Sequence, residues 1–147
     1  MELDHVGLVV PHLDDAVGWY SSTFGFGIAW REAETTVDGA ALGLPGESAR
    51  LKGSGLAVGG AYLELHEYLR PVGSATRRTC DPGFGHIAIR SDDIHSDTER
   101  LASAGLRFMG PPRLITSGGL AGVRWVYAQD PWGNVIELCQ RGEPLSK

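Results

Sequence analysis

A segment near the start of this chain recurs in its second half, and this repeat limits the folds that the chain can adopt. LDHVGLVV at residues 3–10 aligns with FGHIAIRS at residues 84–91, histidine on histidine. The two copies also end alike, because YLEL at residues 62–65 and VIEL at residues 135–138 share an apolar-apolar-Glu-Leu pattern. The chain therefore consists of two related modules.

Each module has the pattern of one strand, one helix and three further strands. In the first module, alternation over residues 4–10 predicts a strand. Helical spacing of apolar residues predicts a helix from about Leu13 to Thr23, with Asp14 near its N-cap. In the second module the corresponding helix is expected over residues 94–104, ending at Gly105.

The two modules predict the domain organisation. We expect a single domain over residues 1–147, with a first βαβββ module at residues 3–70, a linker at residues 71–83 and a second βαβββ module at residues 84–141. The first module carries extra residues before its last strand, near residues 43–54. The fold class is α+β, and the paired modules are expected to form a curved, cup-like mixed sheet.

Composition excludes several classes of function. Thirteen Lys and Arg against eighteen Asp and Glu give a net charge of -5, which attracts neither nucleic acid nor an anionic membrane. The apolar stretches are strand-sized and no leader pattern is present, so we expect a soluble, cytoplasmic protein. The two cysteines, Cys80 and Cys139, cannot form a disulfide framework and are expected to be free thiols.

The alternation of side chains along a strand separates a core face from a polar face. Leu63 and Leu65 belong to the helix-covered core, so Glu64 and His66 are expected on the opposite, concave face. In the last strand the same argument places Glu137 on that face. A carboxylate inside a curved sheet is costly unless it is paired or binds a cation.

Each module offers one histidine on its first strand and one glutamate on its last, and a pseudo-twofold axis between the modules would bring the four together. Two imidazoles and two carboxylates form a mixed set suited to Zn, Ni, Co, Mn or Fe(II), and residue types alone do not choose among these metals. The four candidate metal ligands are His5, Glu64, His86 and Glu137.

Five segments, LDHVGLVV, GWYSSTFGF, YLELHEY, FGHIAIRSDDI and DPWGNVIEL, resemble the vicinal oxygen chelate superfamily, which has the glyoxalase/bleomycin-resistance fold. The resemblance implies metal ligands at the first and last strands of each module, where His5, Glu64, His86 and Glu137 stand. Members that only bind ligands generally lack this set, so its retention implies an enzyme. The chemistry implied is chelation of neighbouring substrate oxygens by one divalent metal.

Glu47 favours an epimerase within this superfamily. Its position before Glu64 resembles that of a catalytic glutamate in methylmalonyl-CoA epimerases, and Glu137 would be the second catalytic group. Inversion at one carbon by deprotonation and reprotonation needs an acid or base on each side of it.

The sequence departs from that epimerase family in two places. Asp-Pro-Trp-Gly-Asn precedes Glu137 where the family has a His-Pro-Lys type of loop, and a single His86 replaces its usual His-His. Only Arg77 and Arg78 could meet the phosphate of a CoA thioester. We therefore expect a smaller, oxygen-rich ketone, such as a keto sugar or a keto cyclitol like 2-epi-5-epi-valiolone.

Two more residues are predicted to bind substrate, and a second chain is expected. His66 shares the face of Glu64, and Tyr127 shares a strand face with Trp125. Paired modules with exposed sheet edges suggest a homodimer, in which the ligands come from one chain or from two.

The first hypothesis is thus a metal-dependent epimerase or isomerase that abstracts a proton next to a carbonyl through a metal-stabilised enediolate, with Zn, Ni, Co or Mn favoured over Fe. A glyoxalase-type lyase is the nearest alternative, followed by a non-catalytic, antibiotic-resistance-like protein that sequesters a ligand. An extradiol dioxygenase comes last, because that chemistry usually uses two histidines and one glutamate, and a fourth ligand would crowd oxygen.

Overall fold

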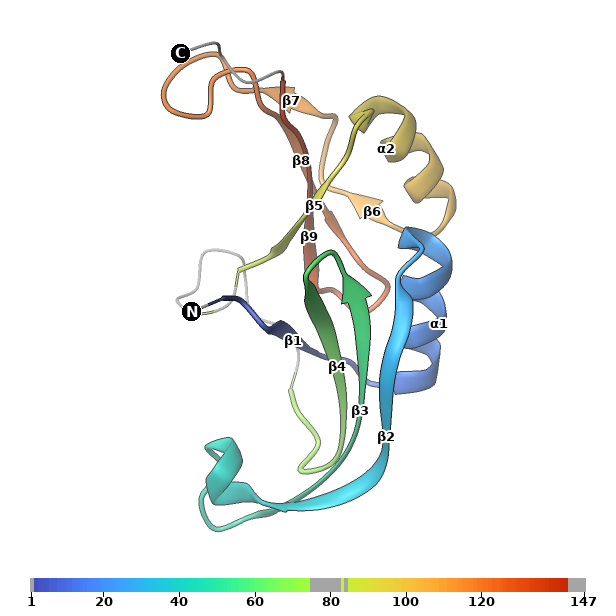
Figure 1. The fold of residues 1–147 in the computed structure, drawn as a ribbon, viewed down its shortest axis with the longest axis vertical. Coiled ribbons are helices and arrows are strands. Elements are labelled where there is room, and N and C mark those ends of the chain that lie inside the picture. Colours follow the sequence, from blue (N-terminus) through green and yellow to red (C-terminus); the bar gives the residue numbers. More distant parts are fainter. Residues whose placement is uncertain (1, 75–82, 84, 143–147) are drawn as a thin grey trace. The chain divides into compact units, whose positions relative to one another are not determined.

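The structure is a computed structural model, and it describes residues 2–74, 83 and 85–142. The chain divides into two compact units, Met1–Ala75 and Thr76–Lys147. The division falls in the segment at residues 71–83, where the sequence predicts a linker. Each unit has the order of elements that the repeat predicts, a strand and a helix followed by further strands (Figure 1). None of the helices in the described part of the chain is long and apolar enough to cross a bilayer.

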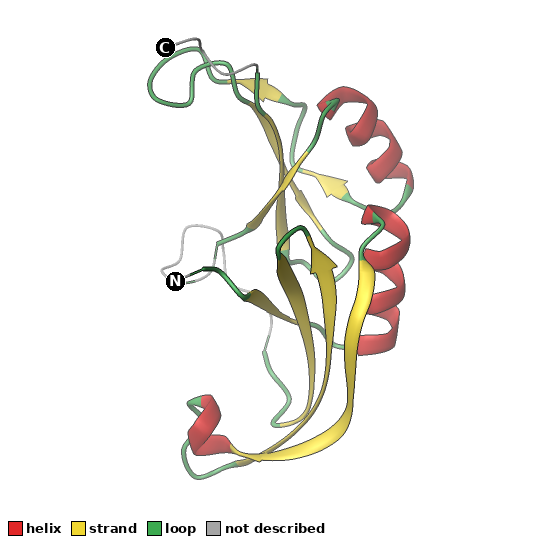
Figure 2. Ribbon diagram, in the orientation of Figure 1, coloured by secondary structure: helices red, strands yellow, loops and turns green. Residues whose placement is uncertain are grey.

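The first unit contains one sheet with one long helix against it (Figure 2). The strands have the order β1-β4-β3-β2, with β1 parallel to β4 and the other pairs antiparallel. Between β2 and β3 the chain forms a short 3-10 helix, η1. The elements are β1 (His5–Val9), α1 (Leu13–Phe24), β2 (Gly27–Asp38), η1 (Gly39–Leu42), β3 (Ser48–Val58) and β4 (Ala61–Arg70). Part of the segment expected as extra residues at 43–54 is therefore regular strand.

Helix α1 forms because apolar residues recur at helical spacing and face the sheet. Leu13, Ala16, Val17 and Tyr20 are all buried. They pack on the face of the sheet that also holds the core leucines of β4. The helix ends at Gly25, whose φ of 75° is the left-handed conformation that closes a helix.

Helix α1 begins at Leu13, as the sequence predicts, but a residue outside the helix caps it. The N-cap is His12, and its side chain makes no capping hydrogen bond, while Asp14 lies in the first turn and accepts a hydrogen bond from Arg31 at 2.8 Å. The backbone N–H of Leu13 instead donates to Glu67 Oε2 on β4, at 2.8 Å. A residue distant in sequence thus caps this helix, which local sequence rules do not predict.

The second unit repeats this plan with shorter strands. Its strands have the order β5-β9-β8-β6, with β7 also paired to β8, and β5 runs parallel to β9. The helix α2 ends one residue before the predicted end. The elements are β5 (Ile87–Arg90), α2 (Ile94–Ser103), β6 (Arg107–Phe108), β7 (Arg113–Leu114), β8 (Arg124–Gln129) and β9 (Val135–Gln140).

Four strands follow α2 where three were expected. The strand predicted after this helix is split into β6 and β7, which pair with opposite ends of β8. Between them lies Gly110-Pro111-Pro112. Proline has no N–H to donate to a ladder, so the pairing is interrupted there. The α+β class and the paired-module fold are nevertheless those predicted, now seen as two mixed sheets.

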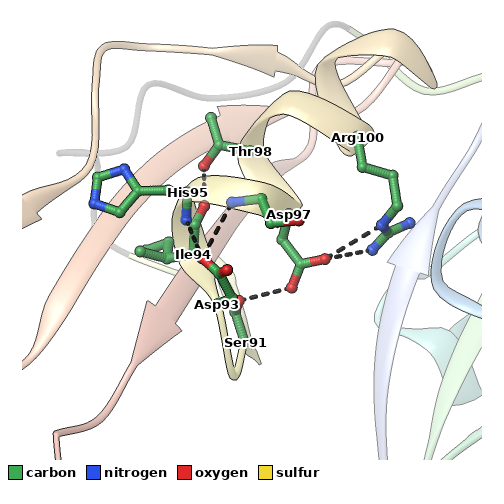
Figure 3. Close-up of polar contacts among 8 residues, drawn as sticks. Ser91, Asp93, Ile94, His95, Asp97, Thr98 and Arg100 are labelled. Carbon is green, nitrogen blue, oxygen red and sulfur yellow. Dashed lines mark hydrogen bonds and ion pairs between the residues drawn. The ribbon is translucent and has the colours of Figure 1, made fainter.

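The N-terminus of α2 is held by a polar network (Figure 3). Asp93 is the N-cap, and its carboxylate accepts from the backbone N–H groups of His95 and Ser96 at 3.2 Å. Asp97, in the first turn, accepts from Ser91 Oγ at 2.7 Å and from Arg100 Nη2 at 2.8 Å. These contacts lower the pKa of Asp97 below its ordinary value of 3.8, and the hydrogen bond from Ser91 has the largest effect.

This network predicts a pH-dependent contribution to stability. Asp97→Asn should lower the free energy of unfolding at pH 7 by about 1 kcal/mol, because it weakens the Ser91 contact and removes the Arg100 ion pair. Since the pKa of Asp97 is lowered in the folded state, the difference in unfolding free energy between wild type and variant is fully present above pH 3.8. This difference is lost as the pH falls through the folded-state pKa. Urea unfolding at several pH values measures the difference. Asp92→Asn, at an exposed position just before the N-cap, is the control, and a pH-independent difference would contradict the assignment.

Candidate metal and substrate site

The first unit brings His5 and Glu64 together. Parallel pairing of β1 with β4 sets Gly7 opposite Glu64, so the imidazole and the carboxylate share one face. His5 Nε2 lies 3.5 Å from Glu64 Oε2, and His5 Nδ1 is 2.7 Å from Asp4 Oδ2. The hydrogen bond to Asp4, and then the charge of Glu64, raise the pKa of His5. A carboxylate on the second ring nitrogen is the usual support of a metal-binding histidine.

The second unit brings His86 and Glu137 together in the same way. His86 Nε2 lies 2.9 Å from Glu137 Oε2, and His86 Nδ1 is 3.4 Å from the hydroxyl of Tyr127. Tyr127 stands directly opposite Glu137 in the β8–β9 ladder. Burial, and then the charge of Glu137, raise the pKa of Tyr127, so its phenol stays protonated and can donate a hydrogen bond.

The two pairs are equivalent in atomic detail. In each, the histidine offers Nε2 to a glutamate oxygen, while Nδ1 faces a second polar group. Donor atoms that share one ion at about 2.0–2.2 Å lie roughly 3 Å apart, close to the spacing of both pairs. In the described residues of either unit, no three His, Cys, Asp or Glu side chains gather closely enough to hold a metal. Each unit thus supplies two of the four predicted ligands, with chemistry that fits a divalent cation.

His66 lies beside the first pair, as the alternation along β4 predicts. Its Nε2 is 3.8 Å from Glu64 Oε2, and its ring contacts Tyr68 edge-on. Leu63 and Leu65 are buried on the opposite face, under α1. The Oε2 atom of Glu64 therefore has two imidazoles near it, those of His5 and His66.

A small pocket of about 130 Å³ lies beside the second pair. Its walls are mostly apolar and include the two aromatic rings of β8, Trp125 and Tyr127, which meet edge-on at 5.1 Å. It is lined by Met109, Gly110, Pro111, Arg113, Trp125, Val126 and Tyr127. Tyr127 thus connects this pocket to His86, consistent with the predicted contact to substrate.

The described cysteine, Cys139, lies near Glu137 but is not suited to nucleophilic chemistry. Cys139 is a free, half-buried cysteine, and its pKa is raised by burial and then by the charge of Glu137. Its thiol is therefore a poor nucleophile at neutral pH. Cys80, Arg77 and Arg78 lie outside the described residues.

Glu47 lies in the turn between η1 and β3. Its backbone is fixed, because its carbonyl accepts from Gly39 at 3.0 Å and its N–H donates to Leu44 at 3.2 Å, whereas its side chain is exposed. The residue opposite Glu64 is Gly55, so roughly 25 Å of strand separates Glu47 from that position. Within the first unit, Glu47 and Glu64 are not brought together.

Sequence reasoning missed several residues that shape the first pair. Asp4 orients His5, and Gly7 and Gly55 flank Glu64 on the neighbouring strands. Trp30 of β2 then covers Gly55. Glycines inside a strand often mark a place where another group packs closely on the backbone. The Gly53-Ser54-Gly55 segment was the sequence signal for such packing.

The fold and the two pairs define a class: an α+β protein of two βαβββ modules, each with one His–Glu pair. The model of the Glyoxalase/Bleomycin resistance protein/Dioxygenase superfamily matches residues 2–138. The chain belongs to this superfamily, as the sequence resemblance implied.

Individual relatives agree with this assignment. A 2-epi-5-epi-valiolone epimerase from an Actinomyces species is 35% identical, over 91% of this chain and 76% of its own length. A glyoxalase family protein from Bacillus cereus has a TM-score of 0.75 and 23% identity, covering 97% of this chain and 95% of its own. The fosfomycin resistance protein FosX from Listeria monocytogenes has a TM-score of 0.65 and 19% identity, covering 97% and 95%. The two solved structures establish the fold alone.

Proposed function

We propose that this protein is a metal-dependent epimerase that moves a proton at the carbon next to a carbonyl of a small keto polyol. The observation that carries the proposal is the presence of two equivalent His–Glu pairs, one in each unit. The substrate class is supported by the relative named 2-epi-5-epi-valiolone epimerase. A keto cyclitol of this kind has neighbouring oxygens beside an acidic C–H bond.

The proposed metal ligands are His5, Glu64, His86 and Glu137, holding one Zn, Ni, Co or Mn ion. Each unit would contribute two ligands, so a set of four needs one first unit and one second unit. These two units would come from the same chain or from the two chains of a homodimer. When bound, the ion supplies Lewis-acid polarisation of neighbouring substrate oxygens, which makes the adjacent C–H bond more acidic.

The protein groups of the second unit suit proton transfer. Glu137 is mostly shielded from solvent, at 18% exposed, and its oxygen lies beside His86. In the proposed reaction this carboxylate takes the proton from the substrate carbon, and a second group returns a proton to the opposite side of that carbon. The protonated hydroxyl of Tyr127 is placed to donate a hydrogen bond to a substrate oxygen.

Glu47 remains our prediction for the second proton-transfer group. Glu47 is distant along β3 from Gly55, the residue opposite Glu64. We therefore propose that Glu47 acts in a site whose Glu64 comes from another copy of the chain. If Glu47 is not this group, His66 is the next candidate, since it lies 3.8 Å from Glu64.

Solvent exchange tests the function. The protein loaded with each of the four metals should introduce deuterium from D₂O into 2-epi-5-epi-valiolone at the carbon next to its carbonyl, followed by mass spectrometry and NMR. Glu47→Gln should slow this exchange by about 100-fold or more while metal content stays at the wild-type level. Normal exchange by the variant would move the role to His66. No exchange by the wild type with any of the four metals, together with tight ligand binding, would support a sequestering protein instead.

A further inference from the structure

Trp30 of β2 lies flat on the backbone of β3. It is paired in register with Gly55, and a Cβ atom at Gly55 would stand only 2.1 Å from Trp30 Nε1 and 2.5 Å from Cε2. A Cβ atom at Gly53 would stand 3.3 Å from Trp30 Cζ3. The indole therefore spans two glycines, and any side chain at Gly55 would displace it.

The indole lies on the same face as the first His–Glu pair. In the β3–β4 ladder, Gly55 is opposite Glu64 and Gly53 is opposite His66, and paired residues direct their side chains to one face. The Cβ position of Gly53 is also 3.1 Å from His66 Cδ2. Indole and imidazole thus meet over Gly53, next to the carboxylate of Glu64.

This arrangement leaves a flat aromatic surface open. Trp30 is 36% exposed, so part of the indole is accessible to a ligand. Its backbone is fixed, because Ser54 Oγ, fully buried, donates to the Trp30 carbonyl at 2.9 Å. Two glycines inside one strand lower its stability, and here they allow a rigid ring beside the candidate ligands.

We infer that Trp30 forms a stacking subsite for the ring of the substrate, an inference that rests on the proposed function and narrows the substrate to a cyclic polyol. The negative face of the indole attracts the C–H groups on one side of a six-membered ring. Glu64 and His66 then lie at the edge of the stacked ring. An open-chain keto sugar has no such flat C–H face.

Kinetics and ring contacts together test this subsite. Trp30→Ala should raise KM for 2-epi-5-epi-valiolone about tenfold and leave kcat within about threefold, because stacking is made equally in the ground and transition states. Trp30→Phe, which keeps a flat ring, should recover most of the loss. A second readout needs neither metal nor turnover: saturation transfer by NMR from the metal-free protein to the ring protons of the same compound, expected in the wild type and lost in Trp30→Ala.

Two glycine variants separate stacking from folding. Gly55→Ala keeps the tryptophan but displaces the indole, and should raise KM as Trp30→Ala does. Gly27→Ala adds the same methyl group to the same β2–β3 ladder with nothing within 4 Å, and should leave KM unchanged. If Trp30→Ala still catalyses exchange with an unchanged KM and still shows saturation transfer, the proposed subsite is wrong. The wild type could instead show saturation transfer that Trp30→Ala loses, yet catalyse no exchange. That result would overturn the proposed function but would still support the subsite.

Discussion

Glu137→Gln is expected to abolish the exchange of substrate hydrogen with solvent, with a rate at least about 1,000-fold below that of the wild type. The amide cannot accept the proton, and it is also a weaker donor to a cation than a carboxylate is. The Glu137 carboxylate lies 2.9 Å from His86 and is paired in register with Tyr127, which lines the small pocket. Deuterium incorporation, followed by NMR, measures the rate.

The two roles assigned to Glu137 are separable. If it were a ligand only, saturating the variant with metal would restore exchange, and the role as base would be wrong. If it is also the base, the variant stays inactive when fully loaded, as elemental analysis would establish. Glu99→Gln is the matched control, because it removes the same charge from an exposed position on α2 in the same unit and should retain full exchange.

Periodicity predicted the elements of the fold well, because burial of one apolar face governs both strands and helices. The spacing of Leu13, Ala16, Val17 and Tyr20 is a property of local sequence, and all four are buried against the sheet. The alternation that buries Leu63 and Leu65 likewise turns Glu64 and His66 to the other face. The His–Glu pairs follow from this register.

Features that depend on contacts distant in sequence were not predictable. Glu67 caps α1 from across the sheet, and no local rule connects it to Leu13. Trp30 lies on Gly53 and Gly55 only because β2 and β3 pair in one register, shifted by bulges. The turn that holds Glu47 depends on hydrogen bonds to Gly39 and Leu44, which set its backbone and leave the carboxylate exposed.

The first pair has a feature that the second lacks. Glu64 Oε2 is 3.5 Å from His5 and 3.8 Å from His66, and the indole of Trp30 lies over Gly55, the residue opposite Glu64. In the second unit Glu137 is flanked by Tyr127 in the β8–β9 ladder and by Ala88 in the β5–β9 ladder. The two glutamates therefore have different surroundings, with an indole and a second imidazole near Glu64 and a phenol near Glu137.

Glu64→Gln should lower the affinity for the metal by at least about 100-fold, a loss expected when one charged ligand of four becomes a neutral amide. The substitution also removes the carboxylate that lies between two imidazoles, so His5 keeps only its contact with Asp4. Metal content after dialysis against a chelator of known affinity measures the change. Asp15→Asn removes one negative charge from an exposed position on α1 in the same unit and should leave metal content unchanged.

The alternative for the first pair is an ordinary surface ion pair between His5 and Glu64. In that case Glu64→Gln would leave metal affinity as it is and change only stability, and by little, because exposed ion pairs are screened by solvent. Loss of metal affinity without loss of stability of the metal-free protein has the opposite meaning, because an ion that binds the folded chain adds to its stability only while the ion is present. Metal titration and urea unfolding of the same variant therefore decide between the two.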